Sequence, residues 1–115
     1  MIVVTTNELQ GYRVVKQFGL VRGLSVRSRS IVGNIGAAIQ IVFGGNISVY
    51  TKLADEARAE ALHLLEQNAA AMGANAVLSM RFDSSELAGT MSEIVAYGTA
   101  VVVAPDNATS PPATE

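Results

Sequence analysis

The sequence predicts an α+β fold of two layers, in which a mainly antiparallel sheet is covered on one face by two helices. The first observation is the order of patterns: β-branched runs at both ends of the chain flank two segments with helical spacing. The second is the composition, because 115 residues that are 50% hydrophobic and 16% charged can bury one core and seldom more. The other sheet face is then left to solvent or to another subunit.

The first part of the chain reads as strand. Residues 1–5 form a short β-branched run that ends before Asn7. Residues 12–26 are again rich in Val, Leu and Phe, with Gly19 and Gly23 as interruptions. Because glycine within a strand pattern indicates a bulge, a bend or a close backbone approach, we expect one long bent strand or two short ones.

Two helices are predicted next. Ser30 can cap the first, which Gly44 and Gly45 end. The second runs from about residue 48 to 72, where Gly73 is placed for a left-handed cap. Each helix carries an apolar stripe at helical spacing. The stripes are Ile31, Ile35, Ala38, Ile39 and Val42 in the first helix, and Tyr50, Leu53, Ala54, Ala57, Ala61, Leu64, Leu65 and Met72 in the second.

A hairpin of residues 76–83 and 93–103 completes the predicted domain. If its turn centres on Ala88, Asp83 faces Glu93, and Arg81 faces Val95 on the same side of the sheet. The opposite side then lies beneath the helices and collects Leu78, Met80, Phe82, Ile94, Ala96 and Ala100.

The domain is expected to span residues 1–104, and residues 105–115, with three prolines, to form a disordered tail. The N-terminus has no basic region and turns polar at Thr5, so it does not resemble a signal peptide. The longest apolar stretch, residues 31–43, is too short and too interrupted to span a membrane. We therefore expect a cytoplasmic protein with no membrane partner.

Charge is unevenly divided along the chain. Residues 1–50 hold five basic residues and one acid, whereas residues 51–115 hold three basic residues and nine acids. One basic and one acidic surface would favour head-to-tail contact between copies, and two ordinary solvated faces are the alternative. The net charge of −2, three Tyr, three Phe and no Trp argue against a nucleic-acid partner.

Most catalytic chemistry is excluded by residue type. The chain has no Cys, hence no thiolate nucleophile or sulfur-ligated metal. Its single His63 has Glu60 and Glu66 three residues to either side, a set that could hold a metal, but we favour an ordinary surface histidine. The Gly-rich segments lack the Walker lysine and the dinucleotide fingerprint. We expect neither an enzyme nor a resident cofactor.

The strongest basic cluster is Arg22, Arg27 and Arg29. These guanidinium groups could bind phosphate or another anion. The alternative is that they pair with the acidic half of a neighbouring subunit.

The predicted hairpin register sets Asp83 opposite Glu93, and two facing carboxylates are unfavourable unless something compensates. Arg81 on the diagonal is the simplest candidate, followed by an arginine of a neighbouring subunit. A divalent cation, Ca²⁺ or Mg²⁺ rather than a heavy metal, is the functional alternative. We favour an arginine.

Several runs together resemble the YbjQ-like family of uncharacterised proteins labelled "putative heavy-metal-binding". The resemblance covers residues 1–103. It is carried by Gly19-Leu20-Val21-Arg22-Gly23, Arg27-Ser28-Arg29-Ser30, Ile35-Gly36-Ala37-Ala38, Gly44-Gly45, Tyr50-Thr51, Gly73-Ala74-Asn75-Ala76-Val77, Arg81-Phe82-Asp83 and Tyr97-Gly98-Thr99-Ala100-Val101.

This resemblance implies a subunit fold like that of dodecin, assembled as a ring of identical chains, typically a pentamer, with no established reaction. Asn34 and Asn46 stand where the family pattern leads us to expect acids, which, with the absence of Cys, argues against a soft heavy metal. We expect a homo-oligomeric ring of unassigned biochemical role. The alternative is a ring that binds a small molecule or anion between subunits, with Arg22, Arg27 or Arg29 near Tyr50 or Tyr97.

Overall fold

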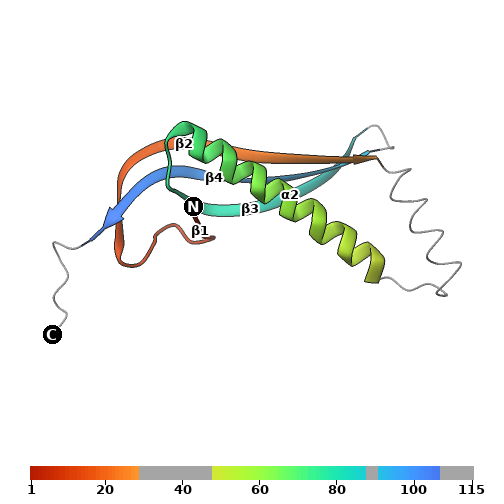
Figure 1. Cartoon of the computed structure of the whole chain (residues 1–115), viewed down its shortest axis with the longest axis horizontal. Helices are drawn as coiled ribbons and strands as arrows, with labels where there is room; N and C mark the ends of the chain where they lie inside the picture. Colours follow the sequence, from red (N-terminus) through yellow and green to blue (C-terminus); the bar gives the residue numbers. More distant parts are fainter. Residues whose placement is uncertain (29–47, 88–90, 107–115) are drawn as a thin grey trace, which may run out of the picture.

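The structure, a computed structural model, describes residues 1–28, 48–87 and 91–106. This part of the chain forms a four-stranded sheet in the order β1-β3-β4-β2, with one helix across it (Figure 1). The strands β2 and β3 are antiparallel to β4, whereas β1 is parallel to β3, so the sheet is mixed. The α+β class is confirmed, and the helix predicted over residues 30–43 lies outside the described residues. The elements are β1 (Ile2–Val3), β2 (Tyr12–Ser28), α2 (Ser48–Met72), β3 (Ala76–Leu87) and β4 (Met91–Pro105).

The strand β2 is one long strand, the first of the two alternatives expected for this region. Its pairing with β4 shifts register between Val14 and Lys16 and again between Gln17 and Gly19. Gly19 has a φ of +105°, a conformation that favours glycine over residues with a Cβ. The irregularities therefore concentrate in the first half of the strand, and its pairing is regular from Gly19 onward.

The helix α2 ends as its sequence predicts. Gly73 follows the last helical residue with a φ of +98°. Its N–H donates to the Ala70 carbonyl (3.0 Å), and the Ala74 N–H donates to the Ala69 carbonyl (3.0 Å). This bond pair is a Schellman cap, which turns the chain directly into β3.

Small residues let α2 pack closely on the sheet. Its buried stripe is Ala57, Ala61, Leu65 and Ala69, spaced by four residues; Met72, which the sequence predicted in the stripe, is 37% exposed. Beneath it, a Cβ built on Gly23 would lie 2.1 Å from the Ala61 carbonyl oxygen. The core on this side of the sheet comprises Val21, Ala61, Leu65, Ala69, Ala74, Val77, Ala96 and Ala100.

The predicted hairpin register was wrong. The strands β3 and β4 pair as far as Leu87 and Met91, so their register is centred one position later than the predicted centre at Ala88. Asp83 therefore lies opposite Val95, and Glu93 lies opposite Ser85. The prediction failed because it ended both strands too early, and moving the centre of a turn by one residue moves every partner by two.

A bulge in β3 also changes which residues face the helix. The register shifts between Leu78 and Arg81, where Ser79 has a positive φ of 56°. As a result Val77 packs in the core beneath the helix, and Leu78 packs on the opposite side, the reverse of the prediction. The bulge has no composition signal, since neither Ser79 nor its neighbours are glycine. The predicted placement of Met80, Ile94, Ala96 and Ala100 on the helix side is confirmed.

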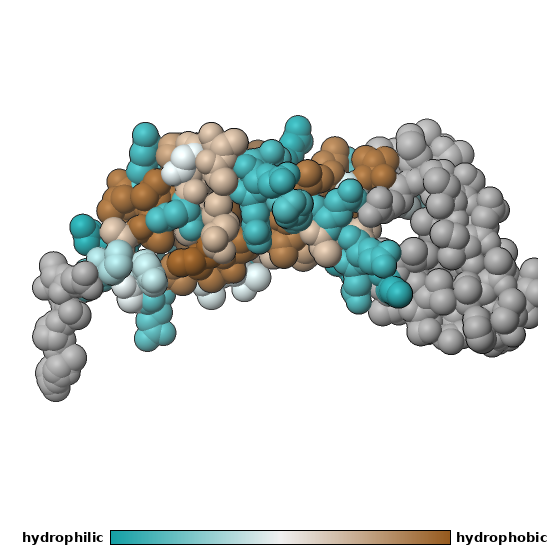
Figure 2. Space-filling model, viewed as in Figure 1, coloured by the Kyte–Doolittle hydropathy of each residue, from teal (hydrophilic) through white to brown (hydrophobic). Residues whose placement is uncertain are grey.

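Within the residues that the structure describes, one end of the second sheet face is covered. Ile2, Val4 and Leu9 pack there against Ala76, Leu78, Val101 and Val103. On the helix side, the outward surface of α2 forms a diagonal band of hydrophilic residues with hydrophobic residues on both sides of it (Figure 2). No helix among the described residues is long and apolar enough to cross a membrane.

Candidate binding surface on the open sheet face

The end of the second sheet face over which no described residue packs presents apolar side chains to the surface. Residues that pair across strands lie on the same face, so the register defines this surface. We call it the open face; it comprises Leu20, Arg22, Leu24 and Val26 of β2, Glu93, Val95, Tyr97 and Thr99 of β4, and Arg81, Asp83 and Ser85 of β3. Leu20 is 72% exposed, Leu24 41% and Val26 43%. Scattered exposed apolar residues are common in proteins, but Leu24 and Val26 are neighbours on this face, and Leu20 lies on the same face beyond Arg22.

One cross-strand row of the open face is a tyrosine between two arginines. Tyr97 of β4 lies opposite Arg22 of β2 on one side and opposite Arg81 of β3 on the other. A guanidinium group can bind an oxyanion with two parallel hydrogen bonds, and a phenol can donate a third. The row therefore has the residue types that recognise an anion.

The flanking groups in this row are held by backbone contacts. The Arg81 Nη1 donates to the carbonyl oxygens of Thr5 and Met80, both at 2.8 Å. These bonds hold the Arg81 side chain where the N-terminal segment borders the open face. On the other flank, the Asn68 Nδ2 of α2 donates to the Arg22 carbonyl oxygen at 2.7 Å, which ties the backbone of Arg22 to the helix. The sequence predicts Arg22 and Tyr97 as candidate ligand groups and Arg81 only as a partner of the carboxylates, because only the strand register reveals that Arg81 flanks Tyr97.

The other two predicted arginines do not join this row. Arg27 pairs with Ser92, five residues along β2 from Arg22, at a position of opposite parity. Alternation along a strand therefore does not bring Arg22 and Arg27 into one row. Arg29 lies outside the described residues.

The predicted carboxylate pair is diagonal rather than directly opposed. Asp83 and Glu93 belong to neighbouring rows of the same face, and such neighbours are about 7–8 Å apart. Each has a local partner: the Ser84 N–H donates to Asp83 Oδ1 (2.9 Å), and the Ser85 hydroxyl donates to Glu93 Oε1 (3.0 Å). The repulsion that called for a compensating cation is therefore weaker than in the predicted register.

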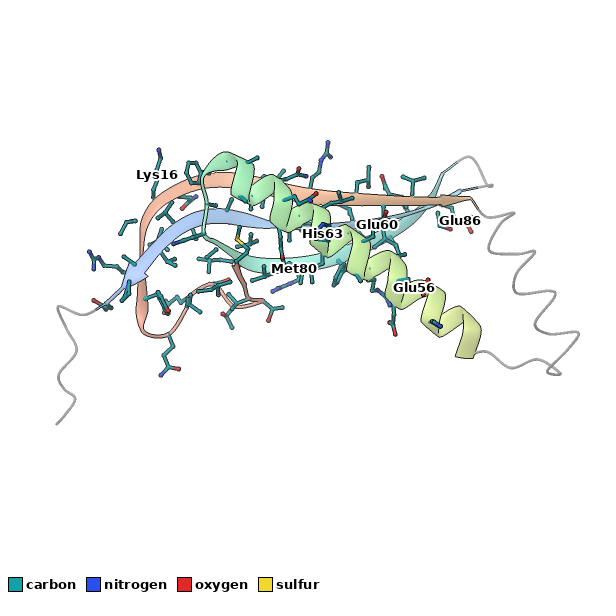
Figure 3. All side chains as sticks on the ribbon, viewed as in Figure 1. Lys16, Glu56, Glu60, His63, Met80 and Glu86 are labelled. Atoms are coloured by element: carbon teal, nitrogen blue, oxygen red, sulfur yellow. The ribbon has the colours of Figure 1, made fainter. Side chains whose placement is uncertain are left out.

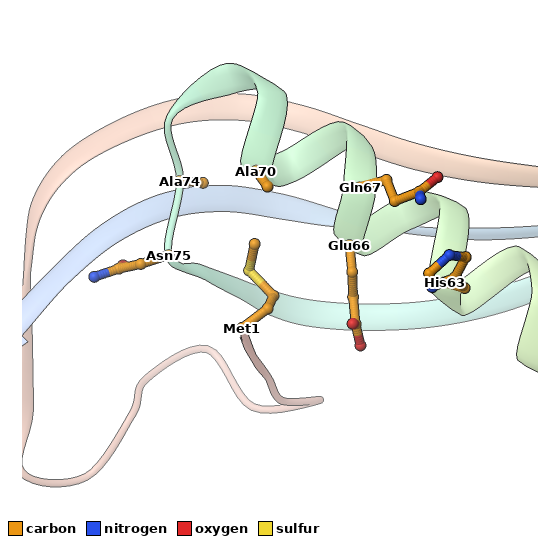
Figure 4. A pocket seen from close by; sticks show the side chains of 7 residues that line it. All are labelled: Met1, His63, Glu66, Gln67, Ala70, Ala74 and Asn75. Atoms are coloured by element: carbon orange, nitrogen blue, oxygen red, sulfur yellow. The ribbon is translucent and has the colours of Figure 1, made fainter.

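The histidine cluster divides between two sides of α2. His63 and Glu66 line a surface pocket of about 410 Å³ together with Met1, Gln67, Ala70, Ala74 and Asn75 (Figure 4). Glu60, by contrast, accepts a hydrogen bond of 2.6 Å from the hydroxyl of Ser25 on β2. His63 and Glu60 are labelled on the helix in Figure 3. The set of Glu60, His63 and Glu66 therefore does not converge on one point.

The polar groups of this pocket do not form a metal site. The Asn75 side chain is fully engaged with the Val103 backbone, since Nδ2 donates to its carbonyl (3.0 Å) and Oδ1 accepts from its N–H (2.8 Å). Within residues 1–28, 48–87 and 91–106, no three His, Cys, Asp or Glu side chains gather in a way that could hold a metal ion.

Comparison with known proteins identifies the family. The model of the family described as "putative heavy-metal-binding" matches residues 1–104. The chain belongs to the YbjQ-like family. The resemblance noted in the sequence is thus confirmed over nearly the same residues.

Relatives within the YbjQ-like family share about half of their residues with this chain. A UPF0145 protein of Bradyrhizobium sp. is 54% identical over 105 residues, which cover 91% of this chain and 95% of the relative. UPF0145 proteins of Solibacter usitatus and Sulfurisphaera tokodaii are 48% and 50% identical, each over 103 residues and 90% of this chain, covering 92% and 90% of the relatives. The names of these relatives state no biochemical activity.

A solved structure supports the fold. The crystal structure of a Pediococcus pentosaceus protein of unknown function, of the DUF74 family, aligns with a TM-score of 0.53 and 15% identity. The alignment covers 90% of this chain and 98% of that one. At this identity the similarity concerns the fold alone.

Proposed function

We propose that this YbjQ-like protein is the subunit of a homo-oligomeric ring, a pentamer, and that it acts by assembly and binding rather than by catalysis. The observation that carries the proposal is the open face, where Leu20, Leu24 and Val26 of one strand expose apolar side chains. Exposed apolar side chains gathered on one sheet face often mark a protein interaction site. The number of subunits comes from the family resemblance alone.

The uneven charge supports a partner that is another copy of the chain. All four charged residues of β2 are basic: Arg13, Lys16, Arg22 and Arg27. The helix α2 and strand β3 carry most of the acids. Identical chains with one basic and one acidic region attract each other head to tail, and in a ring every such region finds its complement.

Light scattering after size exclusion tests this proposal. The chain has a mass of 12.0 kDa, so a pentamer has about five times that mass. We expect the larger value at micromolar concentration. A mass of 12.0 kDa across the concentration range would contradict it.

A second candidate function is binding of a small anionic ligand by the ring. The observation that favours it is the row of Arg22, Tyr97 and Arg81 on the open face. In a ring this row recurs once per subunit, so several guanidinium groups could act together on phosphate or a carboxylate.

Inorganic phosphate is the probe for the anion site, with binding followed by NMR titration. We expect Arg22→Gln to weaken binding at least tenfold and Arg22→Lys to restore it in part, because lysine keeps the charge but loses the fork. Arg13→Gln is the matched control, since it removes a basic residue of the same strand outside the row. Equal losses in the Arg13 and Arg22 variants would indicate only general attraction by charge.

The family label names a heavy metal, and it calls for a separate test. Native mass spectrometry of protein purified from its own host reports the mass of the assembly and of any ligand bound to it. Elemental analysis of the same sample measures metal per chain. A stoichiometric metal would favour the family label, a bound organic molecule or anion would favour the second candidate, and a bare ring would favour assembly alone.

A further inference from the structure

We propose that copies of this chain join edge to edge at the hairpin end of the sheet. By hairpin end we mean residues 23–28 of β2, 91–96 of β4 and 82–87 of β3, which pair with one another. In the proposed contact, the outer edge of β2 at residues 23–28 pairs with the outer edge of β3 at residues 82–87 in the next copy. This inference rests on the proposed self-association and names the surfaces that make it.

The chain already covers the first part of the β3 edge. Here β1 pairs with Ala76 and Val77, and the N–H groups of Ser79 and Met80 donate to the carbonyls of Thr6 and Val4, both at 2.9 Å. The described residues supply no strand partner for this edge beyond that point, over residues 82–87.

The β2 edge shows the same division. The side chain of Asn68 binds the Arg22 carbonyl, so the helix supplies a partner to the backbone just before the hairpin end. From residue 23 to 28 the structure, within its described ranges, shows pairing with β4 only. Figure 1 shows the three strands running on past the point where α2 diverges from them, and Figure 3 places Glu86 near this end. Two edge segments of six residues, neither with a further strand partner among the described residues, therefore lie at the same end of one sheet. We call these two segments the open edges.

Apolar side chains flank both open edges. Leu24 and Val26 are 41% and 43% exposed on β2, and Phe82 is 39% exposed on β3. An open edge with apolar side chains is a template for pairing with another chain, and natural proteins normally cover or charge such edges. Three strands open on both edges also lack the protection that a closed sheet provides.

The charged residues of the two edge segments favour pairing of β2 with β3. Residues 23–28 carry one basic residue, Arg27, and no acid, whereas residues 82–87 carry two acids, Asp83 and Glu86, and no basic residue. Pairing β2 with β2 would bring basic residues together, and pairing β3 with β3 would bring four acids together. Only β2 against β3 joins opposite charges, which favours a head-to-tail contact.

The geometry of this contact suits a ring. Because β2 and β3 are both antiparallel to β4, they point in the same direction. When neighbouring copies keep their helices on the same side, β2 of one copy and β3 of the next pair in parallel and the sheet continues. A contact between two different surfaces repeats from copy to copy until it closes, and closure leaves no open edge.

Single-cysteine variants test the contact, because the chain has no cysteine of its own. Val26→Cys and Ser85→Cys are co-expressed with different tags and treated with a short bismaleimide. Val14→Cys replaces Val26→Cys in the control, since Val14 lies on the same strand with a similar exposure of 48% but far from the hairpin end. We expect the Val26 and Ser85 pair to give several-fold more mixed-tag product than the control pair or either variant with itself. Circular dichroism verifies that each variant folds.

Hydrogen exchange of the unmodified protein provides a second measurement. Pairing predicts that amides within residues 82–87 exchange more slowly at high than at low protein concentration. Cross-linking of Val26→Cys mainly to itself would mean that β2 meets β2 and would overturn the inference. An oligomer by light scattering with neither mixed product nor protection would also overturn it, while leaving self-association intact. A monomer of 12.0 kDa would overturn both.

Discussion

Gly23 is a residue at which α2 approaches the sheet closely. A Cβ at this position would lie 2.1 Å from the Ala61 carbonyl oxygen and 2.2 Å from the Leu65 nitrogen. Both atoms belong to the backbone, so no side-chain rotation can relieve the overlap. We expect Gly23→Ala to destabilise the fold by about 3 kcal/mol, at the upper end for overpacked sites, as measured by urea unfolding. Gln17→Ala, at an exposed position of the same strand, is the control. A loss below about 0.5 kcal/mol would show that the helix can move away freely.

Two serines of this protein bind glutamates, one in a buried and one in an exposed setting. The hydroxyl of Ser25, which is 3% exposed, donates to Glu60, and that of exposed Ser85 donates to Glu93. Because water can replace only the second bond, we expect Ser25→Ala to cost about 1 kcal/mol and Ser85→Ala less than about 0.5 kcal/mol. Urea unfolding at neutral pH measures both variants. Equal losses would contradict the role assigned to burial.

At the scale of elements, the end of α2 depends on one backbone conformation. Gly73 has a φ of +98°, and a Cβ there would lie 3.5 Å from the Phe18 ring, which is an ordinary contact distance. The free-energy cost of a side chain at this position therefore comes from the left-handed backbone conformation and not from a steric clash. We expect Gly73→Ala to lower stability by about 1–2 kcal/mol. Gly73→Asn should cost less, because asparagine tolerates left-handed backbone better than alanine. Thermal unfolding measures the loss of stability in both variants. An equal loss in both would contradict this explanation.

At the scale of the whole molecule, the open face links the fold to assembly. We expect Leu24→Gln to raise the dissociation constant of the oligomer at least tenfold, because it removes an apolar side chain from the proposed interaction surface. Met72→Gln is the matched control, since Met72 is 37% exposed and Leu24 41%, and Met72 lies at the end of α2. Light scattering over a dilution series measures the dissociation constant of each variant. If the two variants dissociate alike, the open face is not the surface that associates.

Patterns in the sequence determined the local elements of this protein. The bounds of α2 and its glycine cap followed from helical spacing and from Gly73, and the bent strand followed from glycines within a β pattern. The family followed from runs spread over residues 1–103. These features depend on residues close together in the chain, where periodicity and backbone preferences act directly.

Tertiary structure alone decided which residues of different strands meet. The register that pairs Leu87 with Met91 made Asp83 and Glu93 diagonal, and the bulge at Ser79 exchanged the faces of Val77 and Leu78. Each change shifts register by a residue or two, and the alternating pattern of a strand fits the correct and the shifted pairing almost equally well. The row of Arg22, Tyr97 and Arg81 joins three strands, so it exists only once all three registers are set. The open edges arise in the same way, since a strand has an edge only by its place in the sheet.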